Sequence, residues 1–200
     1  PRSIVDADQQ LVPSVVSVMV VHEPGDWFDE TLRAMAAQDY PNLRHLFLLT
    51  PETDADEVEA HIRSVLPDAF VRGLAANVGF GPAVGEVLRL VEGDNGFFLM
   101  CHDDVAPEPR VVRLLVAEMF RSNAGFIGPK LVDWDQPRRL QHVGLGLDRF
   151  GEVDPVVGPD EVDQEQHDAV RDVFVLPSAF MLARADLFRA LGGFDPAISF

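Results

Sequence analysis

Continuous apolar runs alternate with amphipathic segments over the first 130 residues, and this alternation restricts the fold more than any other feature. Residues 14–21 (SVVSVMVV) are rich in β-branched side chains, and residues 97–101 (FFLMC) are all apolar. Such runs are typical of strands covered on both faces. The segments between them have helical spacing and end in turn residues. We therefore expect right-handed βαβ units, a mainly parallel central sheet and an α/β three-layer sandwich.

The pattern predicts five strands and five helices, all but the last helix within the first 130 residues. The strands are expected at 14–21, 44–49, 69–71, 97–101 and 125–127, and the helices at 26–38, 53–66, 83–91, 109–122 and 185–191. Asp26 is a candidate N-cap for the first helix, and Thr53 or Asp54 for the second.

The chain changes character after residue 130. Residues 152–172 contain eight acidic residues against one arginine, which predicts an exposed loop. Residues 173–181 return to strand-like composition. Residues 1–13 are polar and are expected to form a lead-in, so that 14–200 would be a single domain.

Charge and cysteine content exclude several classes of protein. The net charge is −17, from 16 basic and 33 acidic residues, so the chain lacks the cationic surplus that nucleic-acid binding requires. The single cysteine, Cys101, excludes an internal disulfide and a cysteine-rich zinc site. The longest apolar runs are far shorter than the ~20 residues of a membrane helix. An anionic ligand would need a local device such as a metal ion or a helix N-terminus.

Two adjacent acids, Asp103 and Asp104, follow the buried run 97–101 directly. They would therefore lie at the carboxyl end of a central strand, the edge where open α/β sheets bind ligands. Three explanations fit the pair: a helix cap, ordinary surface acids, or a site for a hard cation, which prefers oxygen ligands. The neighbouring His102 is either a further ligand or a hydrogen-bonding filler.

A second candidate element is the loop 77–81 (NVGFG), which follows a strand and precedes a helix. Its backbone N–H groups could face a phosphate, or it could be a plain turn. The GxGxxG fingerprint and the GxxxxGK[ST] motif are both absent, which counts against Rossmann cofactors and P-loop nucleotides.

Taken in order, these segments resemble the family 2 glycosyltransferases of GT-A fold, most closely the rhamnosyltransferase-like branch. The resemblance covers about 15–200. Its pieces are VVSVMVVHEPGDWFDETLRAMAAQDYPN (15–42), NVGFGPA (77–83), MCHDDVAPEP (100–109), IGPKLVDWD (127–135), LQHVGLGLD (140–148) and LPSAFMLARADLFRALGGFDPAISF (176–200). MCHDDVAPEP is similar to the metal-binding Asp-x-Asp segment of the family. Each motif is weak alone, and their ordered set is specific.

The resemblance implies a Rossmann-related GT-A fold and a metal-dependent, inverting transfer from a nucleotide-diphosphate sugar. Mg²⁺ or Mn²⁺ would bridge the donor diphosphate, with Asp104 as the metal ligand and Asp103 near the ribose. The remaining implied donor contacts are Val21, His22, Glu23, Asn77 and Gly79. The implied acceptor side consists of Gly192, Gly193, Phe194 and Asp195.

The resemblance also implies how the chain is organised and where it acts. Residues 14–130 would be the nucleotide-sugar half, and 131–200 an acceptor-side half that is incomplete at its end. The catalytic base would lie beyond Phe200, so this piece alone would transfer poorly or not at all. The acceptor would be a glycan or a lipid-linked glycan in cell-surface polysaccharide synthesis. The parent protein would work at the cytoplasmic face, with or without attachment to the plasma membrane.

Three departures from the family pattern keep an alternative open. The acid expected at the end of the second strand is displaced or missing in the stretch 48–54, so that either Glu52 or Asp54 substitutes for it or base recognition is altered or weak. Gly85 stands where Asn is usual, and Ser178 stands where Gly is usual. The alternative is a degenerate GT-A module that binds or scaffolds without transfer. A phosphotransfer receiver domain fits less well, since its acid pair ends the first strand, where this chain has Val-His-Glu.

Overall fold

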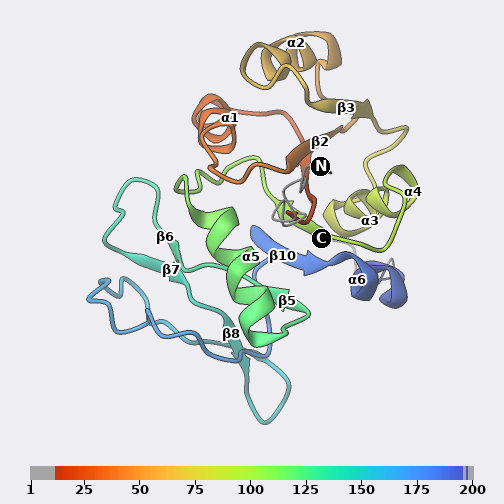
Figure 1. Cartoon of the computed structure of the whole chain (residues 1–200). Helices are drawn as coiled ribbons and strands as arrows, with labels where there is room; N and C mark the ends of the chain where they lie inside the picture. The colour runs from red at the N-terminus through yellow and green to blue at the C-terminus, as the bar shows by residue number, and fades with distance from the viewer. Residues whose placement is uncertain (1–11, 196, 198–200) are drawn as a thin grey trace, which may run out of the picture.

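A six-stranded sheet forms the middle layer of the structure, a computed structural model that describes residues 12–195 and residue 197 (Figure 1). The strand order is β3-β2-β1-β4-β10-β5. The bounds are β1 Val15–Val21, β2 Leu43–Leu49, β3 Phe70–Gly73, β4 Phe97–Cys101, β5 Phe126–Ile127 and β10 Phe180–Arg184. The first four of these strands run parallel, and β10 is antiparallel to both β4 and β5. The mainly parallel sheet predicted from the sequence is confirmed.

Helices cover both faces of this sheet, as Figure 1 shows. One apolar cluster joins Met19, Phe47 and Leu99 to α1 (Phe28–Ala36), α2 (Ala55–Val65) and α5 (Val111–Ser122). A second cluster joins Val18, Leu48 and Met100 to α3 (Phe80–Gly85), α4 (Val87–Leu90) and α6 (Ala185–Leu191). Successive strand residues thus face opposite layers, both apolar. This is the predicted three-layer sandwich.

The helix starts were predicted with mixed success. Asp54 caps α2, because its carboxylate accepts a hydrogen bond from the Glu57 N–H at 3.2 Å. The prediction for Asp26 was wrong: α1 starts at Phe28 after Trp27, and no side chain caps it. The Phe28 N–H at the start of this helix donates to the Gly25 carbonyl at 3.1 Å instead of to a side chain.

Two other predicted elements have different limits. The helix expected at 83–91 is two short helices, starting at Phe80 and separated at Glu86. The strand expected at 173–181 begins only at Phe180, after Pro177. Proline cannot donate a hydrogen bond to a neighbouring strand and is excluded from the interior of a sheet.

Residues 128–179 form an excursion between β5 and β10 that carries two small hairpins. They are β6 (Leu131–Val132) with β7 (Leu140–His142), and β8 (Leu145–Leu147) with β9 (Val153–Pro155) (Figure 1). The acidic run 152–172 is mostly exposed, and Lys130 binds both Asp163 and Asp168 at 2.6 Å. Because β10 lies between β4 and β5, the two predicted halves of the chain share one sheet.

No helix within residues 12–195 combines the length and the apolar character that a membrane span requires.

We predict that Gly96 is the glycine on which the start of β4 depends. Its φ is +102°, and a Cβ there would lie well inside van der Waals contact of the Ser14 carbonyl oxygen. Gly96→Ala should lower the free energy of unfolding by about 2–4 kcal/mol, from left-handed strain plus overpacking. Gly93→Ala is the matched control, because its φ is +90° with nothing near the added methyl. Equal losses in urea titrations of both variants would refute the steric part.

We predict that His45 makes the free energy of unfolding depend on pH. The Nδ1 of His45 lies 2.9 Å from the Ser17 hydroxyl. Burial lowers the pKa of His45 to about 4. Between pH 6.5 and 4 the unfolded chain gains a proton that the folded chain does not, so stability falls as the pH drops through this window. The loss should reach up to about 3 kcal/mol.

His45→Asn keeps a group that can hydrogen-bond to Ser17 but does not titrate. Its stability, measured by urea unfolding at several pH values, should fall less over the same window. A slope equal to that of the original chain would show that His45 does not cause the acid sensitivity.

Candidate functional site

The candidate site lies where β1, β2 and β4 end at one edge of the sheet. In the parallel register Val21 pairs with Leu49, and Met19 pairs with Cys101. The next residues along these strands therefore meet: His22 lies beside Thr50, and the His22 N–H points to the Asp103 Oδ2 at 3.4 Å. The edge thus gathers the predicted donor contacts of β1 with the acid pair of β4.

A chain of hydrogen bonds joins the ends of β1 and β2. The His22 Nδ1 lies 2.9 Å from the Thr50 hydroxyl, which lies 3.3 Å from the Thr53 hydroxyl. Thr53 donates to the Val21 carbonyl at 3.2 Å and accepts from the Glu23 N–H at 3.3 Å. Both threonines are buried, whereas the His22 side chain is 49% exposed. The two threonines therefore fix the His22 ring from its buried side.

Of the other two predicted donor contacts in this turn, one is buried and one is strained. The Val21 side chain is fully buried, and its carbonyl accepts from both Thr50 N–H and Thr53. Glu23 is exposed and has φ +46°, in the left-handed region that non-glycine residues rarely occupy. Strain of this kind persists only where the surrounding contacts enforce it and is common at functional sites.

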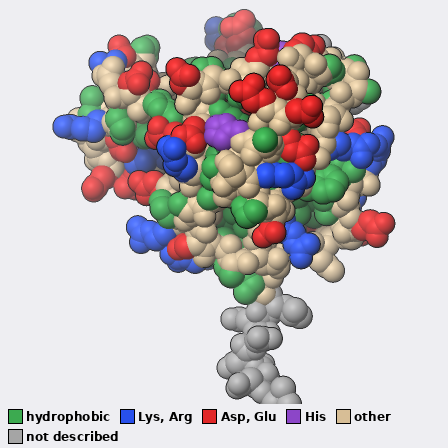
Figure 2. Space-filling model, turned by 90° about the horizontal axis from the view of Figure 1, so that it is seen from above, with side chains coloured by type: hydrophobic (Ala, Val, Ile, Leu, Met, Phe, Trp, Pro, Cys, Tyr) green, Lys and Arg blue, Asp and Glu red, His purple; other side chains and the backbone are tan. Residues whose placement is uncertain are grey.

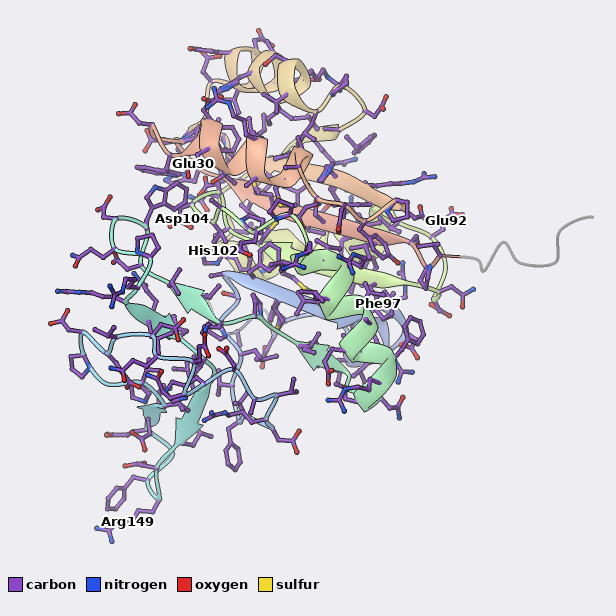
Figure 3. The ribbon with its side chains drawn as sticks, turned by 60° about the vertical axis from the view of Figure 1, so that its left-hand side comes forward. Glu30, Glu92, Phe97, His102, Asp104 and Arg149 are labelled. Carbon is purple, nitrogen blue, oxygen red and sulfur yellow. The ribbon has the colours of Figure 1, made fainter. Side chains whose placement is uncertain are left out.

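The acid pair consists of one half-buried and one open carboxylate. Burial raises the pKa of Asp103, the His22 N–H opposes this, and the neighbouring charge of Asp104 adds to it. Asp104 is 60% exposed. Figure 3 shows Asp104 and His102 at the same end of the sheet, with Phe97, at the start of β4, at the other. A cation here would offset the repulsion between the two adjacent carboxylates.

His102 links β4 to two neighbouring segments at this edge of the sheet. Its Nε2 lies 3.2 Å from the Ser178 hydroxyl, and its ring packs edge-on against Phe80 with centroids 4.5 Å apart. Burial lowers the pKa of His102, and the Asp104 carboxylate, 3.9 Å from its Nδ1, opposes this. Ser178, one of the three departures from the family pattern, thus has a partner in the structure.

The loop after β3 reaches the same edge through Phe80. The Asn77 carboxamide oxygen accepts from the Gly79 N–H at 3.2 Å, and Gly79 has φ +81°. This local turn places Phe80 against His102. Asn77 and Gly79 therefore lie on the loop that borders the acid pair.

The predicted acceptor-side residues end α6 and meet that loop. Gly192 is the C-cap of α6, the Gly193 N–H donates to the Phe188 carbonyl, and Asp195 accepts from the Ala197 N–H. Phe194 lies against Phe80, with ring centroids 6.4 Å apart. The structure thus brings the Gly-Gly-Phe-Asp segment beside the loop 77–81, the predicted donor loop.

Sequence reasoning missed Thr50, Thr53 and Gln38. Gln38 donates to the carbonyls of Pro107 and Glu108 and accepts from the Val112 N–H, so it fixes the loop that follows the acid pair. The only available signal was the Gln-Asp-Tyr-Pro segment, which shows no role without the fold. In the sequence, Thr53 stood out only as a candidate cap of the second helix, and Thr50 only as part of the stretch where an acid is usual.

An acidic cleft of about 620 Å³ adjoins this edge, between the loops that precede α1 and α2. Its carboxylates are Glu23, Asp26, Asp29, Glu52, Asp54 and Glu57. In Figure 2, which shows the molecule from above, acidic side chains gather around a histidine. These charges repel a bare anion, so a phosphate-bearing ligand needs a cation beside it.

The acid pair fits a cation that is shared with a ligand. Within residues 12–195 and 197, no group of three His, Cys, Asp or Glu side chains converges to hold a metal ion. Two carboxylates are nevertheless enough for Mg²⁺-type sites that are completed by substrate phosphates and water. Asp104, the predicted metal ligand, is 60% exposed and could therefore offer a carboxylate oxygen to such a cation.

Comparison with known proteins shows the fold. No protein-family description and no curated protein sequence matches the chain. Residues 1–349 of TarS from S. aureus match with a TM-score of 0.65 at 15% identity, over 94% of this chain and 52% of that one. TarS 1–349 in complex with UDP matches with a TM-score of 0.63 at 16% identity, over 93% and 51%.

A mannosyltransferase also matches: PcManGT from Pyrobaculum calidifontis, solved with GDP-Man and Mn²⁺, with a TM-score of 0.63 at 14% identity, over 94% and 49%. The chain therefore spans about half the length of these neighbours. Its layered, mainly parallel sheet is the GT-A-like fold of glycosyltransferases.

Proposed function

We propose that this chain binds a nucleotide-diphosphate sugar and contributes the donor site of a metal-dependent, inverting glycosyltransferase. The observation that carries the proposal is the contact between two strand ends: His22 at the end of β1 donates its N–H to Asp103, the first of two acids at the end of β4. This contact joins the turn that is predicted to bind the nucleoside to the acids that are predicted to bind the cation, at the sheet edge where α/β folds bind their ligands.

Neighbours of the same fold support this reading. PcManGT was solved with GDP-Man and Mn²⁺, and TarS with UDP. In this chain Asp104 would hold Mg²⁺ or Mn²⁺, which would bridge the diphosphate and stabilise the charge of the leaving nucleotide. Asp103 would orient the ribose, while Asn77 and Gly79 would line the donor pocket. Membership of family 2 and of its rhamnosyltransferase-like branch stays a prediction.

The acceptor would approach over the Gly-Gly-Phe-Asp segment, which Phe194 ties to the donor loop. An inverting transfer needs a base on the face opposite the leaving group to take the proton of the acceptor hydroxyl. The predicted position of that base, beyond Phe200, lies outside the described residues. We further propose a glycan or lipid-linked acceptor, a role in cell-surface polysaccharide synthesis and an intact protein that acts at the cytoplasmic face.

A GT-A module that binds donor without transfer is the second candidate. The observation in its favour is that β2 ends on Thr50, a hydroxyl tied to His22, instead of an acid. Donor binding with turnover in a chain extended past Phe200 would separate the enzyme from the scaffold.

The first test is calorimetry with UDP- and dTDP-sugars, with and without Mn²⁺. Binding should require the metal, and Asp104→Asn should weaken it by more than about tenfold, the loss typical when even a residue that supports a metal ligand is removed. Asp68→Asn is the matched control, because Asp68 is an exposed acid in the turn before β3, at the opposite edge of the sheet.

Metal-independent binding, or equal affinity in Asp104→Asn and the original chain, would refute the assignment of the acid pair. Absence of any nucleotide-sugar binding in all three proteins would refute the proposed function.

A further inference from the structure

The hydrogen bonds that link His22 to Thr50, Thr53 and the Val21 carbonyl have a direction, and this direction determines which nitrogen of the His22 ring carries the proton. The Thr53 hydroxyl has one hydrogen, and its geometry directs it to the Val21 carbonyl at 3.2 Å. Its oxygen is therefore an acceptor toward Thr50, 3.3 Å away. Thr50 then donates to Thr53 and must accept from the His22 Nδ1, at 2.9 Å. The proton of the neutral imidazole thus lies on Nδ1.

The two carboxylates near the His22 ring do not change this assignment of the proton to Nδ1. The Glu52 carboxylate lies 3.7 Å from Nδ1 and the Glu23 carboxylate lies 3.8 Å from Nε2, both beyond hydrogen-bond distance. The two acids therefore act almost equally on the two ring nitrogens. The Thr50 contact at 2.9 Å is the shortest polar contact of the ring. Nε2 is therefore left with a free lone pair.

Nε2 lies on the side of the ring away from the Nδ1 contact with Thr50. The threonines lie on the Nδ1 side and are buried, while the His22 side chain is 49% exposed. The backbone N–H of the same residue binds Asp103, the acid that we assign to the ribose. An acceptor nitrogen therefore lies next to the place where a nucleoside would attach.

We propose that the Nε2 of His22 accepts a hydrogen bond from a ring N–H of the donor nucleobase, and so determines which nucleotide the site takes. The proposal rests on the proposed function and adds the class of donor to it. Uracil and thymine present a ring N–H between two carbonyls, and guanine presents a ring N–H between a carbonyl and an amino-bearing carbon. Cytosine and adenine present an unprotonated ring nitrogen at the equivalent edge, which would place two lone pairs against each other. Thr50 is then a positioning residue.

The first measurement needs no ligand. Long-range ¹H–¹⁵N NMR of the histidine rings, at about pH 8 and thus above the usual range of imidazole protonation, should show His22 protonated on Nδ1. Thr50→Val removes the acceptor and should shift His22 toward the Nε2–H form. Thr31→Val is the matched control: Thr31 is equally buried, and its hydroxyl has no partner in the described part of the chain. Circular dichroism checks that all variants fold.

The second measurement is calorimetry with UDP and CDP in the presence of Mn²⁺. The original chain should bind UDP at least about tenfold more tightly than CDP, because a site built around a hydrogen bond rejects the analogue that lacks the donor. His22→Phe should weaken UDP binding by about threefold to tenfold, the usual contribution of one hydrogen bond. The same change should not weaken CDP binding, because it removes the lone pair that opposes the cytosine ring nitrogen. Thr50→Val should narrow the UDP-to-CDP ratio, and Thr31→Val should preserve it.

The outcomes separate the two proposals. Metal-dependent binding of UDP and CDP with equal affinity, or an Nε2–H ring in the original chain, would overturn the role of His22 and leave the proposed function standing. Failure to bind any nucleoside diphosphate would overturn both.

Discussion

The site depends on the register in which β1 pairs with its two parallel neighbours. Because Val21 pairs with Leu49 and Met19 with Cys101, the three strands end within a few residues of one another. A slip of one residue would move each side chain to the opposite apolar layer, out of its own packing, and would move His22 away from Thr50. The apolar clusters on both faces make such a slip costly. The core thereby fixes the position of polar groups that it does not contact.

Electrostatics explains why such an edge suits a shared cation. The chain carries a net charge of −17, and the neighbouring cleft is lined by six carboxylates. Burial and the neighbouring charge of Asp104 both raise the pKa of Asp103. A divalent ion would reverse the local sign, and the phosphates of the ligand would complete its coordination. The acidity that excludes nucleic acids is thus compatible with a nucleotide.

The sequence allowed the sandwich, the parallel sheet and the location of the acid pair to be predicted, since apolar runs followed by turns report strand ends directly. It did not allow Asp26 to be rejected as a cap, because whether an acid caps a helix depends on the path of the preceding loop. The roles of Thr53 and Gln38 were also hidden. Each bonds groups distant in sequence, such as Val21 and Pro107, that only the tertiary fold brings near.

The antiparallel direction of β10 has a consequence for how the molecule can diversify. Since β5 runs parallel to β4, the chain leaves the sheet at the edge that bears Asp103 and, after residues 128–179, re-enters there as β10. The His102 N–H bonds the Ala179 carbonyl at this return point. The whole excursion is therefore a cassette with both attachment points beside the acids. Evolution can lengthen or exchange it at little entropic cost, reshaping one wall of the binding region while the strands beneath stay in place.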